Sequence, residues 1–231
     1  MRTSNVEVLA YEESSLGVVC LRRRELLSMS GTVVTEITLD HELLVSSFHT
    51  ASERALATCA LERHPGAELR VLIGGLGLGY TAFEVLQSPR VARVEVVELL
   101  PQVVDWLQSG QVPLSPELNA DARFEVVAAD IYARLAAPAG PRFDLILIDV
   151  DHSPDERLGE GNAGFYSPAG LALAKAHLAK GGVLGVWSYA ESSPFADALR
   201  TAFDRVDVET VSFDNRLIDE RETNWLFLAH D

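Results

Sequence analysis

The stretch VLIGGLGLGYT, residues 71–81, places four glycines within six positions directly after a short apolar run. The apolar residues predict a buried strand, and the glycines predict a loop at its end. Glycine tolerates positive φ and lets another molecule approach the backbone closely. A loop of this kind after a strand is therefore typical of a ligand-binding α/β fold, although the loop alone is weak evidence for a nucleotide.

The sequence around this loop alternates apolar strands with helices. The predicted strands are LRVLIG (69–74), ARVEVVEL (92–99), RFEVVAAD (123–130), FDLILID (143–149) and VLGVWSY (183–189), and the longest helix between them is predicted over 168–180. This alternation predicts a parallel sheet covered by helices on both faces. Two final apolar runs, 206–213 and 223–230, predict an antiparallel pair at the sheet edge.

The N-terminal part follows a different pattern. Residues 6–46 alternate short strand-like runs with turn signals, which predicts an antiparallel meander. From about Thr50 the apolar period becomes helical. We therefore predict two parts: a small β module over 1–48 and an α/β domain over 49–231.

Composition narrows the classes of partner and the cellular setting. The formal net charge of -15 argues against binding to nucleic acid or to an anionic membrane. Cys20 and Cys59 lack a paired spacing, which favours a reduced, cytoplasmic setting. Neither a signal peptide nor an apolar run of about 20 residues is recognisable, so we expect a soluble protein. We interpret the triplet Arg22-Arg23-Arg24 as a solvated strand edge rather than an anion site.

Acidic residues follow three of the predicted strands: Glu98, Asp130 and Asp149. Ligands of open α/β sheets bind beyond the carboxyl ends of the strands. An acid after the second strand can accept hydrogen bonds from a ribose, and one after the third can accept from the amine of adenine. Asp149, which follows a further strand, would then face the reactive end of the bound ligand. Carboxylates suit an adenosine with a cationic far end better than a pyrophosphate, which needs donors.

The order of these pieces resembles the spermidine synthase (polyamine aminopropyltransferase) family of the class I S-adenosylmethionine-dependent methyltransferase superfamily. The resemblance is carried by IGGLGLGYT, VEVVELLPQVVDW, FEVVAAD, FDLILIDVDHSP and GFYSPAGLALAKAHLAKGGVLGVW. It implies a Rossmann-like class I methyltransferase fold, with a mostly parallel seven-stranded sheet, helices on both faces and a small antiparallel β module in front. It also implies S-adenosylmethionine, or decarboxylated S-adenosylmethionine, as co-substrate.

The resemblance also implies which residues form the site. The donor would be bound by the glycine loop and three acids, namely Gly74, Gly75, Gly77, Gly79, Glu98, Asp130 and Asp149. Asp149 would orient and deprotonate an attacking amine, because an ammonium has no lone pair. Asp151 and His152 are the further catalytic candidates. From their positions beside the expected cleft, the acceptor would contact His49, Glu53, Tyr80, Tyr166 and Tyr189.

Three departures from the family pattern concern donor selection and acceptor binding. The family's glycine loop carries an acid that binds the free amine of decarboxylated S-adenosylmethionine, whereas this chain has Gly77 there. The family's Tyr-His-Glu segment is replaced by residues 48–50, Phe-His-Thr, although Glu53 lies one helical turn further on. The catalytic loop is one residue longer and adds His152.

These departures favour methyl transfer to a small, amine-containing acceptor. Aminopropyl transfer and a nucleotide-binding module without catalysis remain the alternatives. The partner we expect is a small molecule, and a homodimer is the default assembly.

Each site residue also has a structural alternative. Glu98 and Asp130 could solvate a loop, Asp149 could cap a helix or turn, and His152 could fill a loop. The Asp-x-Asp-His cluster is compatible with Mg²⁺, but no further ligand is identifiable, and we expect no metal. The aromatic residues near the cleft are more typical of a core or rim than of a stacking platform: Phe165, Tyr166, Trp187, Tyr189 and Trp225.

Overall fold

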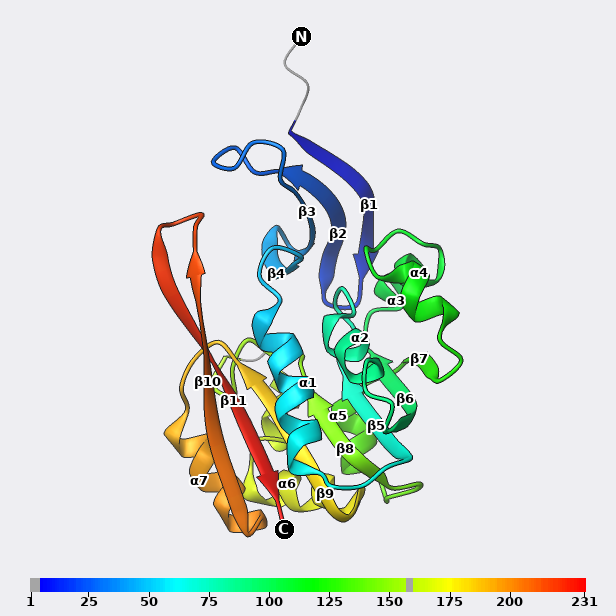
Figure 1. Ribbon diagram of the computed structural model, residues 1–231, viewed down its shortest axis with the longest axis vertical. Helices are drawn as coiled ribbons and strands as arrows, with labels where there is room; N and C mark the ends of the chain where they lie inside the picture. Colours follow the sequence, from blue (N-terminus) through cyan, green and yellow to red (C-terminus); the bar gives the residue numbers. More distant parts are fainter. Residues whose placement is uncertain (1–4, 157–159) are drawn as a thin grey trace.

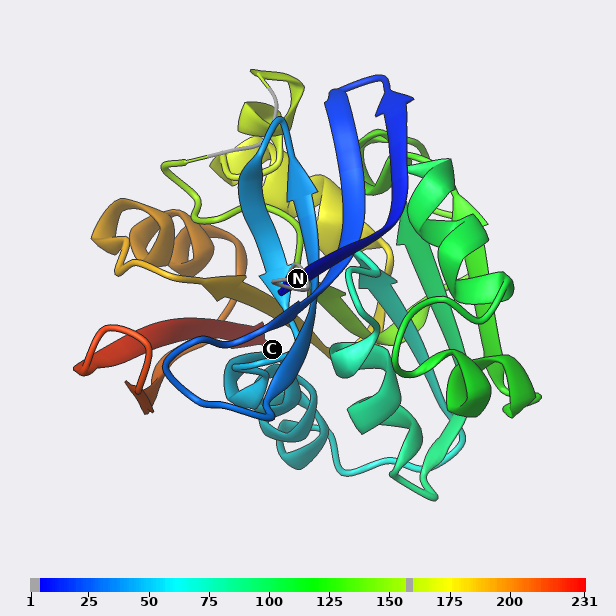
Figure 2. The ribbon, with the colours of Figure 1, turned by 90° about the horizontal axis from the view of Figure 1, so that it is seen from above.

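The computed structural model describes residues 5–156 and 160–231. The N-terminal part is a four-stranded antiparallel sheet in the order β1-β2-β3-β4. Its strands are β1 (Val6–Ser14), β2 (Gly17–Glu25), β3 (Val33–Leu39) and β4 (Glu42–Ser46). The predicted meander is therefore confirmed. This sheet, here called the β module, stands at the top of Figure 1, and its strands lie across the rest of the molecule in Figure 2.

The larger sheet has seven strands in the order β10-β11-β9-β8-β5-β6-β7. These are β5 (Leu69–Gly74), β6 (Val91–Glu98), β7 (Phe124–Ala128), β8 (Phe143–Ile148), β9 (Leu178–Ser188), β10 (Arg205–Asn215) and β11 (Glu220–His230). Strands β5 to β9 run parallel, and β11 joins β9 and β10 antiparallel. The predicted fold class is confirmed, including the antiparallel edge pair.

Helices cover both faces of this sheet. One face carries α1 (Ala51–Arg63), α2 (Tyr80–Leu86), α3 (Pro101–Gln108) and α4 (Ser115–Ala120), and the other carries α5 (Ile131–Ala136), α6 (Pro168–Ala176) and α7 (Ser193–Ala202). The core on the α1 face also includes Val19, Leu21 and Ile37 of the β module. A continuous core therefore joins the module to the α/β domain.

One predicted helix end was wrong, and one short helix was missed. The helix predicted over 168–180 ends at Ala176, and β9 begins at Leu178, which pairs with Phe143 and is buried. The apolar pattern of the residues after Ala176 fits either a helix or a strand, and pairing with β8 decides for the strand. The short helix α4 was not predicted, because six residues give too little periodicity to recognise.

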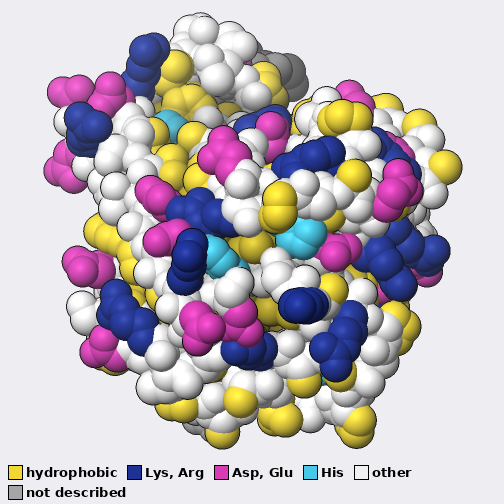
Figure 3. Space-filling model, turned by 60° about the horizontal axis from the view of Figure 1, so that its bottom comes forward, with side chains coloured by type: hydrophobic (Ala, Val, Ile, Leu, Met, Phe, Trp, Pro, Cys, Tyr) yellow, Lys and Arg dark blue, Asp and Glu magenta, His cyan; other side chains and the backbone are white. Residues whose placement is uncertain are grey.

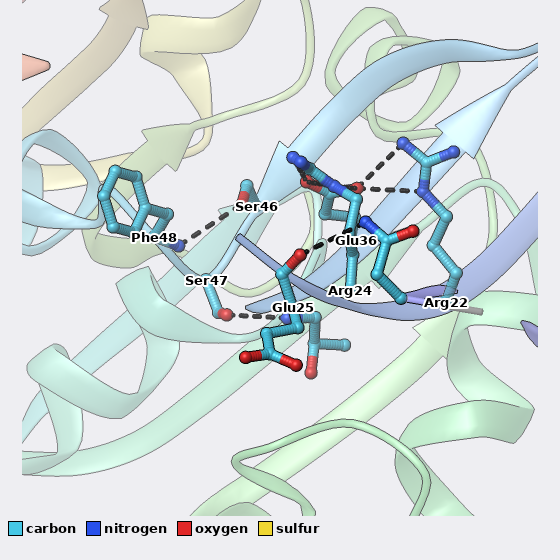
Figure 4. A network of polar contacts seen from close by, with 9 residues as sticks. Arg22, Arg24, Glu25, Glu36, Ser46, Ser47 and Phe48 are labelled. Atoms are coloured by element: carbon cyan, nitrogen blue, oxygen red, sulfur yellow. Dashed lines mark hydrogen bonds and ion pairs between the residues drawn. The ribbon is translucent and has the colours of Figure 1, made fainter. Parts of the chain in front are cut away.

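The arginine triplet does not form a strand edge, because β2 lies between β1 and β3. Arg22 and Arg24 instead bind Glu36 on β3, with nitrogen–oxygen distances of 2.8 and 2.6 Å (Figure 4). Glu36 is only 1% exposed. Burial alone would raise the pKa of Glu36, but the hydrogen bonds from Arg24 and Arg22 outweigh it and lower that pKa. Two of the three arginines therefore stabilise a buried carboxylate.

Charged side chains of both signs are interspersed on the lower face of the molecule (Figure 3). Among the pairs at the surface, Arg63 binds Asp207 and Glu209 at 2.9 and 2.7 Å. Within residues 5–156 and 160–231, none of the helices combines the length and apolarity needed to span a membrane.

Candidate active site

A cavity of about 370 Å³ lies between the β module and the carboxyl ends of the parallel strands. Its floor includes the glycine loop after β5 and the residues that follow β6, β7 and β8. Its roof consists of aliphatic side chains from the module: Leu16, Ile37, Leu39, Leu44 and Val45. The cavity therefore occupies the position predicted for a ligand of this fold.

The glycine loop combines packing with access to the cavity. At Gly75, where φ is +91°, a Cβ atom would lie 2.1 Å from the backbone oxygen of Asp149, so chain packing alone requires glycine there. Gly77, where φ is +51°, lines the cavity, and the nearest atom to a Cβ would be Val45 Cγ1 at 3.7 Å. Gly74 and Gly79 approach Ile131 and Leu118 closely instead. Gly77 is thus the loop position at which a side chain would reach a ligand.

Glu98 ends β6 and is almost fully buried. Its carboxylate accepts hydrogen bonds from the backbone N–H groups of Leu76 and Leu100, at 2.8 and 2.9 Å. Burial raises the pKa of Glu98, and these backbone donors oppose that rise. Glu98 lines the cavity, and a carboxylate oxygen can accept more than one hydrogen bond, as binding of ribose hydroxyls would require.

Asp130 follows β7 and caps helix α5. Its Oδ1 accepts from the N–H groups of Tyr132 and Ala133, at 2.8 and 3.1 Å. The capping role considered for Asp149 therefore belongs to Asp130. Asp130 also lines the cavity, where its other oxygen is available for an adenine amine.

Asp149 and Glu53 form a carboxylate pair at the cavity wall. Asp149 accepts a hydrogen bond from the Thr81 hydroxyl at 2.7 Å, and Glu53, in the first turn of α1, accepts one from Ser52 at 2.9 Å. Burial raises the pKa of Asp149 to about 6. Burial, and then the charge of Asp149, raise the pKa of Glu53 to about 7. Both carboxyl groups therefore hold a proton more readily than free ones do, which suits an amine site.

Asp151 lines the cavity but is bound by the chain itself. It is 2% exposed and accepts hydrogen bonds from Tyr132 at 2.7 Å, Tyr166 at 2.9 Å and Asn162 at 2.9 Å. Burial first, and then Tyr166 and Asp151, raise the pKa of Tyr132, which keeps its phenol protonated as a donor. Asp151 thus fixes the loop after β8.

Three of the other predicted residues lie apart from the cavity wall. The ring of His49 packs between Phe48 and Phe213, with centroids 4.2 and 4.7 Å away. Its buried Nε2 has no hydrogen-bond partner among the described residues. Tyr166 contacts Asp151, and the exposed Tyr189 donates a hydrogen bond to Glu156.

Tyr80 and His152 do line the cavity. The guanidinium of Arg54 lies 5.1 Å from the centre of the Tyr80 ring, and burial raises the pKa of that tyrosine. The ring of His152 approaches Tyr189 edge-on, with centroids 6.5 Å apart. His152 therefore stands at the rim between the cavity and the exposed Tyr189.

Trp187 was not predicted as a site residue, yet it lines the cavity. Ile148 pairs with Val186, so Asp149 and Trp187 leave neighbouring strands side by side. The sequence feature that could have identified Trp187 was its place at the end of a predicted strand. The aliphatic roof of the cavity was also missed. It could have been identified from the alternation of side chains along a strand, which puts Ile37 and Leu39 on the same face of β3.

Comparisons with known proteins give sequence relatives but no matching family model. The chain is 34% identical over 115 residues to putrescine N-methyltransferase 4 of Nicotiana tabacum, covering 50% of this chain and 28% of that protein. It is 34% identical over 128 residues to polyamine aminopropyltransferase 2 of Streptomyces coelicolor, covering 53% and 22%. The matches thus span about a quarter of the relatives' length.

Solved structures resemble nearly the whole chain. A spermidine synthase in complex with the transition-state analogue AdoDATO has a TM-score of 0.74 at 20% identity, covering 96% of this chain and 73% of that one. The spermidine synthase from Thermotoga maritima has a TM-score of 0.73 at 19% identity, covering 96% and 72%. The chain therefore has a spermidine synthase-like fold and is homologous to putrescine N-methyltransferases and polyamine aminopropyltransferases.

Proposed function

We propose that this protein is an S-adenosylmethionine-dependent methyltransferase acting on a small cationic amine. The observation that carries the proposal is the Glu53–Asp149 pair at the wall of a cavity beside the glycine loop. Two half-buried carboxylates with raised pKa values repel each other unless a cation or a proton compensates them. An ammonium group supplies that charge.

The acids at the strand ends fit the donor. Glu98 can accept from the ribose hydroxyls while it holds the loop through Leu76 and Leu100. Asp130 can accept from the adenine amine through the oxygen that does not cap α5. Bound in this way, the donor supplies an electrophilic methyl group on a sulfonium.

Asp149 would then prepare the nucleophile. Its carboxylate takes a proton from the bound ammonium, which frees the nitrogen lone pair, and a pKa of about 6 suits that transfer near neutral pH. The nitrogen forms a bond to the methyl carbon, and the carbon–sulfur bond breaks with its electron pair passing to sulfur. The products are a methylated ammonium, an uncharged thioether and a protonated Asp149, which then releases its proton to solvent, so charge and atoms balance.

Gly77 favours the donor that keeps its carboxylate. The loop position that faces the cavity carries no acid, and its neighbours Leu76 and Leu78 are apolar and buried. An acid there would bind the free amine of the decarboxylated donor but would repel a donor carboxylate. This observation is our reason for proposing methyl transfer rather than aminopropyl transfer.

A product assay with both donors tests the proposal. The protein is incubated with small primary amines and either S-adenosylmethionine or its decarboxylated form, and Asp149→Asn serves as the control. S-adenosylhomocysteine and a methylated amine are the expected products. Methylthioadenosine would indicate aminopropyl transfer, and donor binding with neither product would support a binding module.

A further inference from the structure

We infer that Thr81 is a positioning residue of this site: its hydroxyl holds the Asp149 carboxylate in place and stabilises it in the ionised form. The inference rests on the proposed function, in which Asp149 takes the proton of the amine. The observation that carries it is the 2.7 Å hydrogen bond from Thr81 Oγ1 to Asp149 Oδ2, which joins a helix to a strand end 68 residues away.

Thr81 does not make the hydrogen bond that is common for a threonine in a helix. Such a hydroxyl usually donates to a backbone carbonyl three or four residues earlier in its own helix. Thr58 in α1 and Thr201 in α7 both donate to the carbonyl three residues earlier, at 3.2 and 2.6 Å. Thr81, the second residue of α2, instead reaches out of its helix to Asp149.

The Thr81 hydroxyl has one proton and two acceptors within reach. Asp149 Oδ2 lies 2.7 Å from Thr81 Oγ1, and the backbone oxygen of Glu53 lies 3.4 Å from it. The shorter bond, to a charged acceptor, is the stronger one. Thr81 is only 4% exposed, so water has little access to compete. The proton therefore belongs to the bond with Asp149.

The backbone of Asp149 is held as well as its side chain. Its N–H group donates to the carbonyl of Gly74 at 2.9 Å, which fixes the strand end against β5. Thr81 then holds Oδ2 from α2, the helix that begins directly after the glycine loop. Among the described residues, Oδ1 accepts no hydrogen bond, and Asp149 lines the cavity. Oδ1 is thus the oxygen left for the proton of the amine.

The surroundings of Asp149 make this single donor important. Burial raises the pKa of Asp149 to about 6, and the hydrogen bond from Thr81 opposes that rise. The acids that share the cavity cannot stabilise a further negative charge. The other titratable groups of the cavity wall among the described residues are Glu53, Tyr80, Glu98, Asp130, Tyr132, Asp151 and His152, and Arg54 acts on Glu53 from beside it.

A carbon-13 NMR titration of the side-chain carboxyl groups tests the inference without any substrate. The Asp149 signal is assigned by its loss in Asp149→Asn. In Thr81→Val a methyl group replaces the hydroxyl, and the pKa of Asp149 should rise by about one pH unit. Thr81→Ser keeps the hydroxyl and should stay near wild type. Thr58→Val is the matched control and should leave that pKa unchanged.

Two further comparisons keep the result clear. Thr81→Ala against Thr81→Ser differs only by the hydroxyl oxygen, and this pair decides the question if the valine variant does not fold. Repeating the titrations with Glu53→Gln removes the neighbouring carboxyl that titrates with Asp149. An unchanged pKa of Asp149 without the hydroxyl, or an equal rise in Thr58→Val, would overturn the inference.

The activity readout separates this inference from the proposed function. With an amine that the product assay identifies, the acid limb of the pH profile of kcat/KM should move to higher pH by about one unit in Thr81→Val and return in Thr81→Ser. Turnover with the same acid limb in all three proteins would overturn the role of Thr81 and leave methyl transfer intact. A shifted pKa without any methylated product would support the role of Thr81 toward Asp149 and overturn the proposed reaction.

Discussion

Replacing Glu53 with glutamine should remove a pH-dependent cost of folding. Burial and the charge of Asp149 raise the pKa of Glu53 from 4.5 to about 7. A shift of about 2.5 units, at about 1.4 kcal/mol per unit, corresponds to about 3 kcal/mol. Below pH 4.5 Glu53 is protonated in both the folded and the unfolded chain. Above that pH the unfolded chain ionises first, so stability is lost as the pH rises toward and through 7.

Urea unfolding at pH 5 and pH 8 measures this effect. Wild type should lose up to about 3 kcal/mol relative to Glu53→Gln between the two pH values, because the amide keeps the Ser52 hydrogen bond without a charge. Glu62→Gln is the matched control, since it makes the same change on the exposed face of α1. Parallel pH profiles for wild type and Glu53→Gln would refute the reasoning.

Three further predictions concern the floor of the cavity. Asp149→Asn should abolish methyl transfer while leaving donor affinity within about tenfold, or about 1.4 kcal/mol, in a direct binding titration; normal turnover would remove its catalytic assignment. Gly77→Asp, at a φ that aspartate adopts, should raise kcat/KM for the decarboxylated donor relative to S-adenosylmethionine by about tenfold, and Gly77→Asn should not. Gly75→Ala should cost at least about 2 kcal/mol in urea unfolding, because its Cβ meets the Asp149 backbone. Gly110→Ala, with positive φ but open space, should cost about 1 kcal/mol, and equal losses would contradict the packing argument.

Much of the fold could be predicted because the sequence pattern is locally consistent. Apolar strands followed by helices determined the parallel sheet, and turn signals determined the meander. The boundary at Ala176 could not be predicted, since pairing of Leu178 with Phe143 joins residues far apart in sequence. The partners of Arg22 and Arg24 were hidden for the same reason, because Glu36 reaches them only when β2 pairs with β3.

The candidate site, too, could be predicted from the sequence only in part. The strand-end rule identified Glu98, Asp130 and Asp149, and all three line the cavity. Their local hydrogen bonds could not be predicted, and so the cap was considered at Asp149 rather than at Asp130. Trp187 was missed because its position beside Asp149 depends on the register of β8 and β9.

Proton release during amine binding tests most directly the claim that the Glu53–Asp149 pair is the ammonium site. With pKa values of about 7 and about 6, the pair holds about one proton near pH 6.5. Calorimetric titration of n-butylamine into the protein saturated with S-adenosylhomocysteine, which has no methyl group to transfer, is repeated in buffers of different ionisation enthalpy and should show release of about one proton in wild type and much less in Glu53→Gln. Binding without proton release, or with equal release in both proteins, would contradict the account.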